Sequence, residues 1–580
     1  MNITKNLMMF DIYLSNFTLF VEYFIIVSVL YFTVLLAALR ENIEKFHMQK
    51  SISEFFAVIL MFSCFLVIND DVLYNGGSLC CNSSIINGPI SFYSKLIVCF
   101  FSAIFFFIIA DYLNQQKLID FEYLLILMFS ILGLILLCSS FDLLTSYLAI
   151  ELISLSSYLL SAFRKNNIFS VEAGLKYFII GSISSAFFLL GTTFLYASTG
   201  SIYFHDFNWL FNNQVHEYHY MNFTDEEFFK IIFRGEILHF IFWWENFEAY
   251  DFEKIACHDF IKIGIMLIAF SIFVKLALAP FHLWSLDVYE YSPTISVFYF
   301  STITKLSFFI FIIRFFYQSW NSTPLDYDNF IRSWQNYFLI TGLISLFVGS
   351  VGGITTHRLK TLIAYSSISH MGYNIIAISF AKSFSYGVIS VLLYLIIYML
   401  TGLCFWYIIL ILRLKHIHCV IYPIEKSNIL IKKYSKDIED ISLLCKAQPA
   451  LALGLSFTMF SLAGLPPFIG FVAKLSFFIA CIQDEYYFIP SFAALCSVIS
   501  TFYYIKVVKI IYFEDRLVGK LFYPISHEKS IVLSVFVFLP VFLFAKPTFL
   551  YLFVQSIIFD VICKYNPYYA QYIDFDLYWQ

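Results

Sequence analysis

Residues 274–284 read VKLALAPFHLW, and residues 461–474 read SLAGLPPFIGFVAK. Each stretch combines a lysine and one or two prolines with residues that would otherwise form a membrane-crossing helix. Proline removes a backbone donor and kinks a helix, and broken helices at membrane depth occur where they line cavities. Interrupted spans at matching places of two halves are typical of transporters built from inverted repeats. For either stretch alone, an ordinary proline kink remains the alternative.

The composition indicates that most of the 580 residues lie in a membrane. Hydrophobic side chains make up 60% of the chain and charged ones 13%, against about 45–50% and about 25% in soluble domains. The net charge of −5 provides no basic face for nucleic acid. Twelve cysteines are scattered without a CxxC spacing, so neither a zinc site nor an iron–sulfur site is indicated. We therefore expect an all-α polytopic membrane protein.

The number of spans follows from the length of a bilayer-crossing helix, which needs about 20 apolar residues. Fourteen segments qualify, near residues 21–40, 52–69, 91–112, 122–140, 142–163, 172–196, 260–281, 292–316, 335–352, 359–381, 385–412, 449–471, 474–510 and 530–552. The thirteenth is too long for one straight helix, so we expect a loop near Gln483. With the N-terminus outside, the loops rich in lysine and arginine all face the inner side, as the positive-inside rule requires. Both termini are then outside.

The spans group into four regions. These are helices 1–3 in residues 1–120, a first repeat of helices 4–8 in 121–316, a second repeat of helices 9–13 in 335–515, and a C-terminal helix and tail in 516–580. The two repeats are expected to be inverted copies, with helices 7 and 12 as the broken counterparts. Long polar insertions occupy residues 201–259 and 416–448.

Ionisable residues inside the predicted spans are the candidate functional groups. Glu151 lies near the middle of the fifth span, Lys275 in the seventh, Lys305 in the eighth, and Lys474 at the boundary of the twelfth and thirteenth. Each such charge costs about 2.5–3.5 kcal/mol on insertion scales, which a purely structural span would avoid. Removal from water favours the neutral form of such groups, so they can exchange protons near neutral pH. For Lys474, extension of the side chain to the interface is an alternative.

Two more polar features extend this set into a possible proton relay. Tyr147, Glu151, Ser154 and Tyr158 are spaced by 4, 3 and 4 residues, so they share one helix face that suits a hydrated path. His370 lies in a polar cluster of the tenth span and belongs to the residue type that titrates near physiological pH. A lone helical histidine is otherwise often a satisfied core residue.

Longer segments carry a family resemblance. They are YLAIELISLSSYLLSAFRKNNIFSVEAGLKYFIIGSISSAFFLLGTTFLYASTGSI from residue 147, FVKLALAPFHLWSLDVYEYSPT from 273, RLKTLIAYSSISHMGY from 358 and SLAGLPPFIGFVAK from 461. In this order, over about residues 90–515, the chain resembles the antiporter-like membrane subunits of respiratory complex I. The segment PFHLWSLDVYEYSPT and a lysine at 474 favour the subunit 2 family over subunits 4 and 5.

The resemblance implies roles for the five candidate residues. Glu151 and Lys275 match a charge pair whose opening and closing changes the proton affinity of the lysine. Protons would then pass by way of Lys305 and His370 to Lys474. The family pumps protons with energy from NADH oxidation by quinone, so the chain would act as one subunit of an NADH:ubiquinone reductase.

The same resemblance sets expectations for cofactors, partners and location. No cofactor is expected on this chain, which has no GxGxxG fingerprint; NADH, FMN, iron–sulfur clusters and ubiquinone are expected in other subunits. Expected partners are other complex I membrane subunits, including antiporter-like subunit 4 and small core subunits, together with accessory subunits and lipids such as cardiolipin. The expected location is the mitochondrial inner membrane, with both termini toward the intermembrane space.

Two other function classes share some of these features. A stand-alone or Mrp-type cation/proton antiporter subunit would also contain broken helices and buried lysines, but it would move Na⁺ or K⁺ without a redox arm. A structural membrane subunit would contain the same charges without conducting protons.

Overall fold

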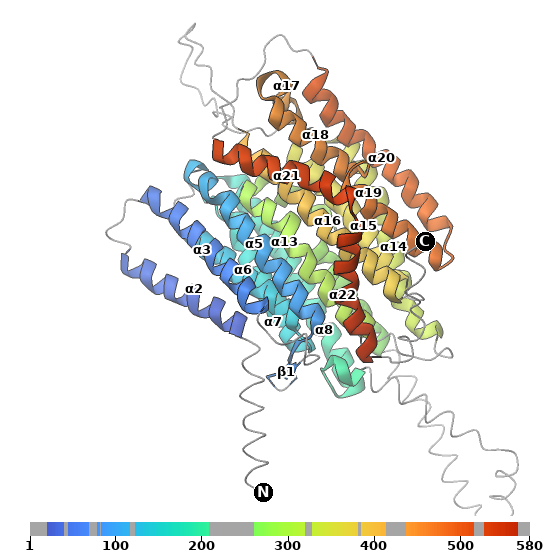
Figure 1. Cartoon of the computed structure of the whole chain (residues 1–580). Helices are drawn as coiled ribbons and strands as arrows, with labels where there is room; N and C mark the ends of the chain where they lie inside the picture. Colours follow the sequence, from blue (N-terminus) through green and yellow to red (C-terminus); the bar gives the residue numbers. More distant parts are fainter. Residues whose placement is uncertain are drawn as a thin grey trace, which may run out of the picture.

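The computed structural model describes residues 20–39, 45–68, 78–116 except 82, 122–207, 260–318, 328–380, 384–412, 437–514 except 443, and 527–565. Within these ranges the chain is a bundle of helices with one small two-stranded sheet (Figure 1). Most of the 201–259 insertion, residues 416–436 of the second insertion, and the tail after residue 565 lie outside the described residues.

The helices follow the apolar segments of the sequence closely. In the first part of the chain they are α2 (Phe20–Leu39), α3 (Lys45–Ile68), α5 (Pro89–Gln116), α6 (Glu122–Ser139), α7 (Leu143–Ala162), α8 (Ile168–Thr199), a helix over 260–276, α12 (Leu283–Tyr291) and α13 (Thr294–Ile312), which continues as the π-helix η1 (Ile313–Gln318). Before α5, β1 (Ser78–Cys80) pairs antiparallel with β2 (Ile85–Asn87).

The second part of the chain continues the bundle. Its elements are α14 (Asp328–Gly352), η3 (Gly353–Thr355), α15 (Leu359–Ser379), α16 (Phe384–Ile411), η4 (Ile438–Ile441), α17 (Leu444–Ala447), α18 (Pro449–Ala463), α19 (Ile469–Gln483), α20 (Phe488–Tyr512), α21 (His527–Ala545) and α22 (Thr548–Tyr565). Helices α2 and α3 lie at one end of the bundle, with α14 and α20 at the other (Figure 1).

Nine helices of the described ranges are each long and apolar enough to cross a bilayer, and the bent pair α21–α22 would be a tenth span. The chain is therefore a multi-pass membrane protein. Two helices form the centre of the bundle. Helix α13 is buried at every position from Ile295 to Ile312, and α16 packs against helices of both halves, among them α5, α13, α15 and α19. A polar group on α13 is thus enclosed by protein within the described part of the chain.

Both predicted helix breaks are present, and they share one backbone motif. The first helix of the seventh span ends at Leu276, and Ala277 has a φ of 58°; α18 ends at Ala463, and Gly464 has a φ of 77°. In each case the second residue after the helix donates its N–H to a carbonyl five residues back, at 3.0 and 3.1 Å. This is the Schellman ending of a helix, which leaves the last carbonyls free for other donors.

The predicted boundary between the twelfth and thirteenth spans is wrong. The expected segments 449–471 and 474–510 are three helices, α18, α19 and α20, of which α18 and α19 are short apolar helices of 15 residues each. The left-handed Gly464 and the two prolines after it end α18 early, so Lys474 lies inside α19 and not at a span boundary. The loop expected near Gln483 is confirmed, because α19 ends there and α20 begins at Phe488.

The last predicted span, 530–552, is also not one straight helix. Helices α21 and α22 meet at an angle of 84°. Pro547 lies at this bend and lacks the N–H that would continue α21, and it disfavours the helical conformation of Lys546 before it. Helix α21 packs across α16, α18 and α19, whereas α22 packs along α16 and α5 (Figure 1). Helix α22 thus continues beyond the predicted end at residue 552, as far as Tyr565.

Candidate functional site

Lys275 is the penultimate residue of its helix before the first break, and it faces α7. Its ammonium donates to the Tyr158 hydroxyl at 3.2 Å and lies 5.6 Å from the centre of that ring. Glu151 lies two turns before Tyr158 on the same face of α7. One oxygen of its carboxylate accepts a hydrogen bond from the Ser154 hydroxyl at 3.2 Å. Within the described part of the chain, the other Glu151 oxygen is buried without a hydrogen bond and the carboxylate makes no ion-pair contact with Lys275. The two residues expected to form a charge pair are therefore not in contact in this structure.

Lys305 lies on the central helix α13 and is 4% exposed. Its ammonium donates to the Leu276 carbonyl at 3.2 Å, which is the last carbonyl before the first helix break. The Schellman ending leaves that carbonyl pointing out of its helix, so the break supplies the partner that the buried lysine needs. Lys275 and Lys305 thus approach the same break, one from inside the broken helix and one from α13.

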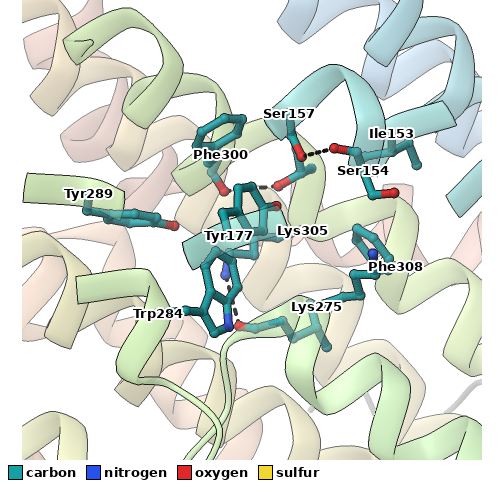
Figure 2. Close-up of a pocket in the computed structure, with 12 residues that line it drawn as sticks. Ile153, Ser154, Ser157, Tyr177, Lys275, Trp284, Tyr289, Phe300, Lys305 and Phe308 are labelled. Carbon is teal, nitrogen blue, oxygen red and sulfur yellow. Dashed lines mark hydrogen bonds between the residues drawn. The ribbon is translucent and has the colours of Figure 1, made fainter. Parts of the chain in front are cut away.

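A small cavity joins these two lysines (Figure 2). It has about 20 Å³ of space for the centre of a water molecule, and about 10–15 Å³ on this measure holds one water. Its walls come from α7, α8, α13 and both sides of the break, and its polar lining consists of Ser154, Ser157, Tyr177, Trp284, Tyr289, Thr304 and the two lysines. Figure 2 shows the Tyr289 hydroxyl pointing toward this group. The site can hold a proton-carrying water between two ammonium groups.

Lys474 repeats the arrangement at the second break. It is 6% exposed, which excludes the interfacial position considered from the sequence, and its ammonium donates to the Ala463 carbonyl at 2.5 Å. Ala463 precedes the left-handed residue of its break just as Leu276 does in the first. The two breaks thus offer equivalent carbonyls, which accept from lysines on different helices. The Lys474 side chain lies against Gly464, where an added Cβ would be 2.7 Å from its Cδ.

His370 is buried in α15 between two tyrosine hydroxyls. Its Nδ1 is 2.7 Å from the Tyr394 hydroxyl of α16, and its Nε2 is 3.2 Å from the Tyr504 hydroxyl of α20. Tyr373, one turn later on α15, stacks on Tyr394, and its ring centre is 5.9 Å from the Lys474 ammonium. Tyr394 and Tyr373 therefore form a chain of contacts from His370 to Lys474. On the other side, α12, which carries Tyr289, packs against α15.

Several buried charges escaped the sequence analysis, among them Glu22, Lys95 and Arg314. Glu22 of α2 and Lys95 of α5 form an ion pair at 2.5 Å with side chains 4% and 2% exposed, and Lys95 also donates to Asn87 at 3.0 Å. Arg314, in η1, donates to the Ser140 carbonyl at 3.0 Å and to the Ser91 hydroxyl. Each of the three lies close to the end of a predicted span, where long charged side chains usually reach water. With the orientation expected from the sequence, Lys95 and Arg314 would lie at outer ends of their spans, where cations are scarce, and that signal was missed.

A second set of ion pairs fixes the short helix α12 from outside. Lys176 of α8 contacts Asp287 at 2.7 Å, and Arg358, before α15, pairs with Glu290. These side chains are partly exposed, so the pairs set the position of α12 more than they add stability. Within the described ranges, no three His, Cys, Asp or Glu side chains gather as metal ligands.

The fold and the site define a class of protein. A multi-pass bundle with two broken helices, each with a buried lysine on the carbonyl freed by the break, is an antiporter-like membrane protein. Residues 140–500 match the family model described as NADH:quinone oxidoreductase/Mrp antiporter, transmembrane. The chain belongs to this family.

Individual relatives agree with this assignment. The chain is 34% identical to NADH-ubiquinone oxidoreductase chain 2 of Marchantia polymorpha over 443 residues, which is 76% of this chain and 77% of the relative. Its fold is similar to a chain of respiratory complex I from Thermus thermophilus, with a TM-score of 0.66 and 20% identity over 92% of this chain and 98% of that one. It is also similar to a chain of the Mrp complex from a Dietzia species, with a TM-score of 0.69, 14% identity, and coverage of 95% and 98%.

Proposed function

We propose that this chain is the proton-translocating subunit 2 of an NADH:ubiquinone oxidoreductase, respiratory complex I. The observation that carries this proposal is the pair of helix breaks with buried lysines, Lys305 on the Leu276 carbonyl and Lys474 on the Ala463 carbonyl. A lysine held by a neutral carbonyl has no countercharge to fix its proton, so its protonation can follow the charges around it. The assignment of a redox partner, the NADH-oxidising part of the complex, rests on the relatives that match at 30% identity or more.

The relay we propose runs through the five candidate residues. Changes at Glu151 alter the charge state of Lys275, the cavity passes a proton between Lys275 and Lys305, and the tyrosines around His370 connect Lys305 with Lys474. The redox energy, NADH, FMN, iron–sulfur clusters and ubiquinone belong to other subunits. The shared cavity and the two hydroxyl contacts of His370 support this order.

The finer topology is part of the same proposal. We infer fourteen spans, with residues 1–120, 121–316, 335–515 and 516–580 as the N-terminal helices, the two inverted repeats and the C-terminal region. The identical helix ending at Leu276 and Ala463 supports the pairing of helices 7 and 12. We further propose a mitochondrial inner membrane location with both termini toward the intermembrane space.

The partners we propose are the other membrane subunits of complex I, with subunit 4 and small core subunits among them, accessory subunits, and lipids such as cardiolipin. Helix α8 supports contacts of this kind, because it exposes a row of large apolar side chains. The row consists of Leu175, Phe178, Ile179, Ile183, Leu189 and Leu190.

The second candidate function is a cation/proton antiporter subunit of the Mrp type. The fold similarity to the Mrp complex favours it, but the fold alone does not distinguish it from a complex I subunit. An antiporter of this type would exchange Na⁺ or K⁺ for protons in vesicles without NADH, whereas a complex I subunit needs its redox arm.

A native gel of mildly solubilised membranes tests the proposal directly. The gel is stained for NADH oxidation, and peptides are sequenced from the active band. We expect peptides of this chain in that band. If they run in a separate complex that exchanges Na⁺ or K⁺ without NADH, the antiporter function replaces this proposal.

Gly464→Ala tests the second break. The added methyl group would displace the Lys474 side chain, so we expect roughly tenfold less NADH-driven proton translocation per assembled complex, in line with the ~10²-fold that a 1 Å misplacement can cost. Gly200→Ala is the matched control, because Gly200 has a φ of 73° and open space around its Cβ. Both variants place alanine in the left-handed region at about 1–2 kcal/mol. Equal pumping by the two variants would argue against a role for the Lys474 position.

A further inference from the structure

The Glu151 carboxylate and the Lys275 ammonium do not contact each other, and Tyr158 holds the ammonium instead. Tyr158 lies two turns after Glu151 on the same face of α7, and its hydroxyl accepts from Lys275. Tyr158 is 7% exposed. Its ring packs edge-on against Tyr177 and Phe178 of α8, with centroid distances of 4.8 and 5.7 Å. The lysine is therefore held by a buried and well-packed hydroxyl.

Gly181 of α8 determines where that hydroxyl lies. A Cβ added at Gly181 would overlap the Tyr158 hydroxyl and come within 2.8 Å of its ring. The absence of a side chain at Gly181 lets the Tyr158 hydroxyl approach α8 this closely while it reaches Lys275. We call Tyr158 and Gly181 the cradle: Gly181 leaves room for the Tyr158 hydroxyl, and this hydroxyl binds the Lys275 ammonium away from Glu151.

We propose that the Tyr158 hydroxyl, positioned by Gly181, is a second docking position for the Lys275 ammonium, and that Lys275 alternates between it and Glu151. The unpaired buried oxygen of Glu151 marks the other position. A carboxylate stabilises a bound proton on the lysine far more than a neutral hydroxyl does. Movement from Glu151 to Tyr158 therefore loosens the proton next to the cavity that leads to Lys305. This inference rests on the proposed function and adds two positioning residues to it.

Tyr158→Phe removes the second position and leaves the ring. Lys275 then stays with Glu151 and releases its proton only at higher pH. We expect the pH profile of NADH-driven proton pumping to shift toward alkaline pH by about one unit, which corresponds to a tenfold change in proton affinity. The NADH-oxidising activity with an artificial electron acceptor should be unchanged. Tyr123→Phe is the matched control, because Tyr123 is a buried tyrosine of α6 that packs against Phe163, away from the relay.

Gly181→Ala tests the cradle with the tyrosine in place. We expect the same alkaline shift, because the methyl group displaces the hydroxyl. In the Tyr158→Phe background, Gly181→Ala still displaces the ring, but it should add no further alkaline shift, because no hydroxyl is left to hold Lys275. Additive effects of the two substitutions would indicate general distortion of α8 and would overturn the cradle.

The outcomes separate the two levels of the proposal. An unshifted pH profile in an assembled Tyr158→Phe or Gly181→Ala complex, with normal pumping by the parent complex, overturns the role of Tyr158 alone. If the parent complex does not pump protons on NADH oxidation, the proposed function itself fails. Should Tyr158→Phe not assemble, Gly181→Ala provides the same comparison with the native tyrosine.

Discussion

A complex with Lys305→Met should assemble and oxidise NADH with an artificial acceptor, but its NADH-driven proton translocation should fall by about a hundredfold. That factor is the lower end of what a positioned proton-transfer group contributes. Lys305 is the one candidate on the central helix α13, and it lines the same cavity as Lys275. Its hydrogen-bond partner, the Leu276 carbonyl, is neutral and provides no countercharge. Methionine fills a similar volume but cannot hold a proton, so the relay stops between the two repeats.

Lys305→Arg distinguishes proton transfer from a purely structural role. Arginine keeps the positive charge and can still donate to the Leu276 carbonyl, but it is not deprotonated in proteins. We therefore expect Lys305→Arg to lose proton pumping as Lys305→Met does. Lys509→Met is the matched control, because Lys509 is an exposed lysine in the last turn of α20. Pumping of the arginine variant at the rate of this control, measured in reconstituted vesicles, would make Lys305 a structural residue.

The sequence predicts most of the helices because a bilayer imposes a length and a composition on each span. It also predicts the breaks at Pro280 and Gly464, since interrupted spans with a lysine at matching places of two halves are typical of inverted repeats. It misplaces Lys474, because the residues of α19 continue the apolar pattern toward α20, and α18 ends at the left-handed Gly464 and the prolines after it. Such an ending depends on local backbone conformation, which hydropathy does not report.

The candidate site is predictable as a set of residues but not as a set of contacts. Glu151, Lys275 and Tyr158 are identifiable from their positions in the spans and the spacing on α7. Which of them touch depends on how closely α8 approaches α7 at Gly181, and that approach is a tertiary property. The same limit hides Glu22 and Lys95, which are ordinary residues near span ends until α2, α5 and the end of β2 enclose them.

The Glu22–Lys95 pair gives the largest expected effect on stability. Lys95→Met leaves the Glu22 carboxylate buried without its cation, and removal of one partner of a buried pair costs about 3–5 kcal/mol. We expect α2 to lose its attachment to α5, with a lower yield of assembled complex and faster loss of this chain on mild heating in detergent. The measurement is the fraction of chain retained in the complex on a native gel after stepwise heating.

Two further variants show whether the cost comes from the unpaired charge. Glu22→Leu combined with Lys95→Met removes both charges, and such replacements of buried ion pairs are often neutral or stabilising. We therefore expect the double variant to recover the retention that Lys95→Met loses. Lys50→Met provides the control, because Lys50 and Glu54 form a half-exposed pair at 3.7 Å that contributes about 0–1 kcal/mol. If Lys95→Met were retained in the complex as well as Lys50→Met, the buried pair would not hold α2. If the double variant were as unstable as Lys95→Met, the loss would come from packing and not from the unpaired charge.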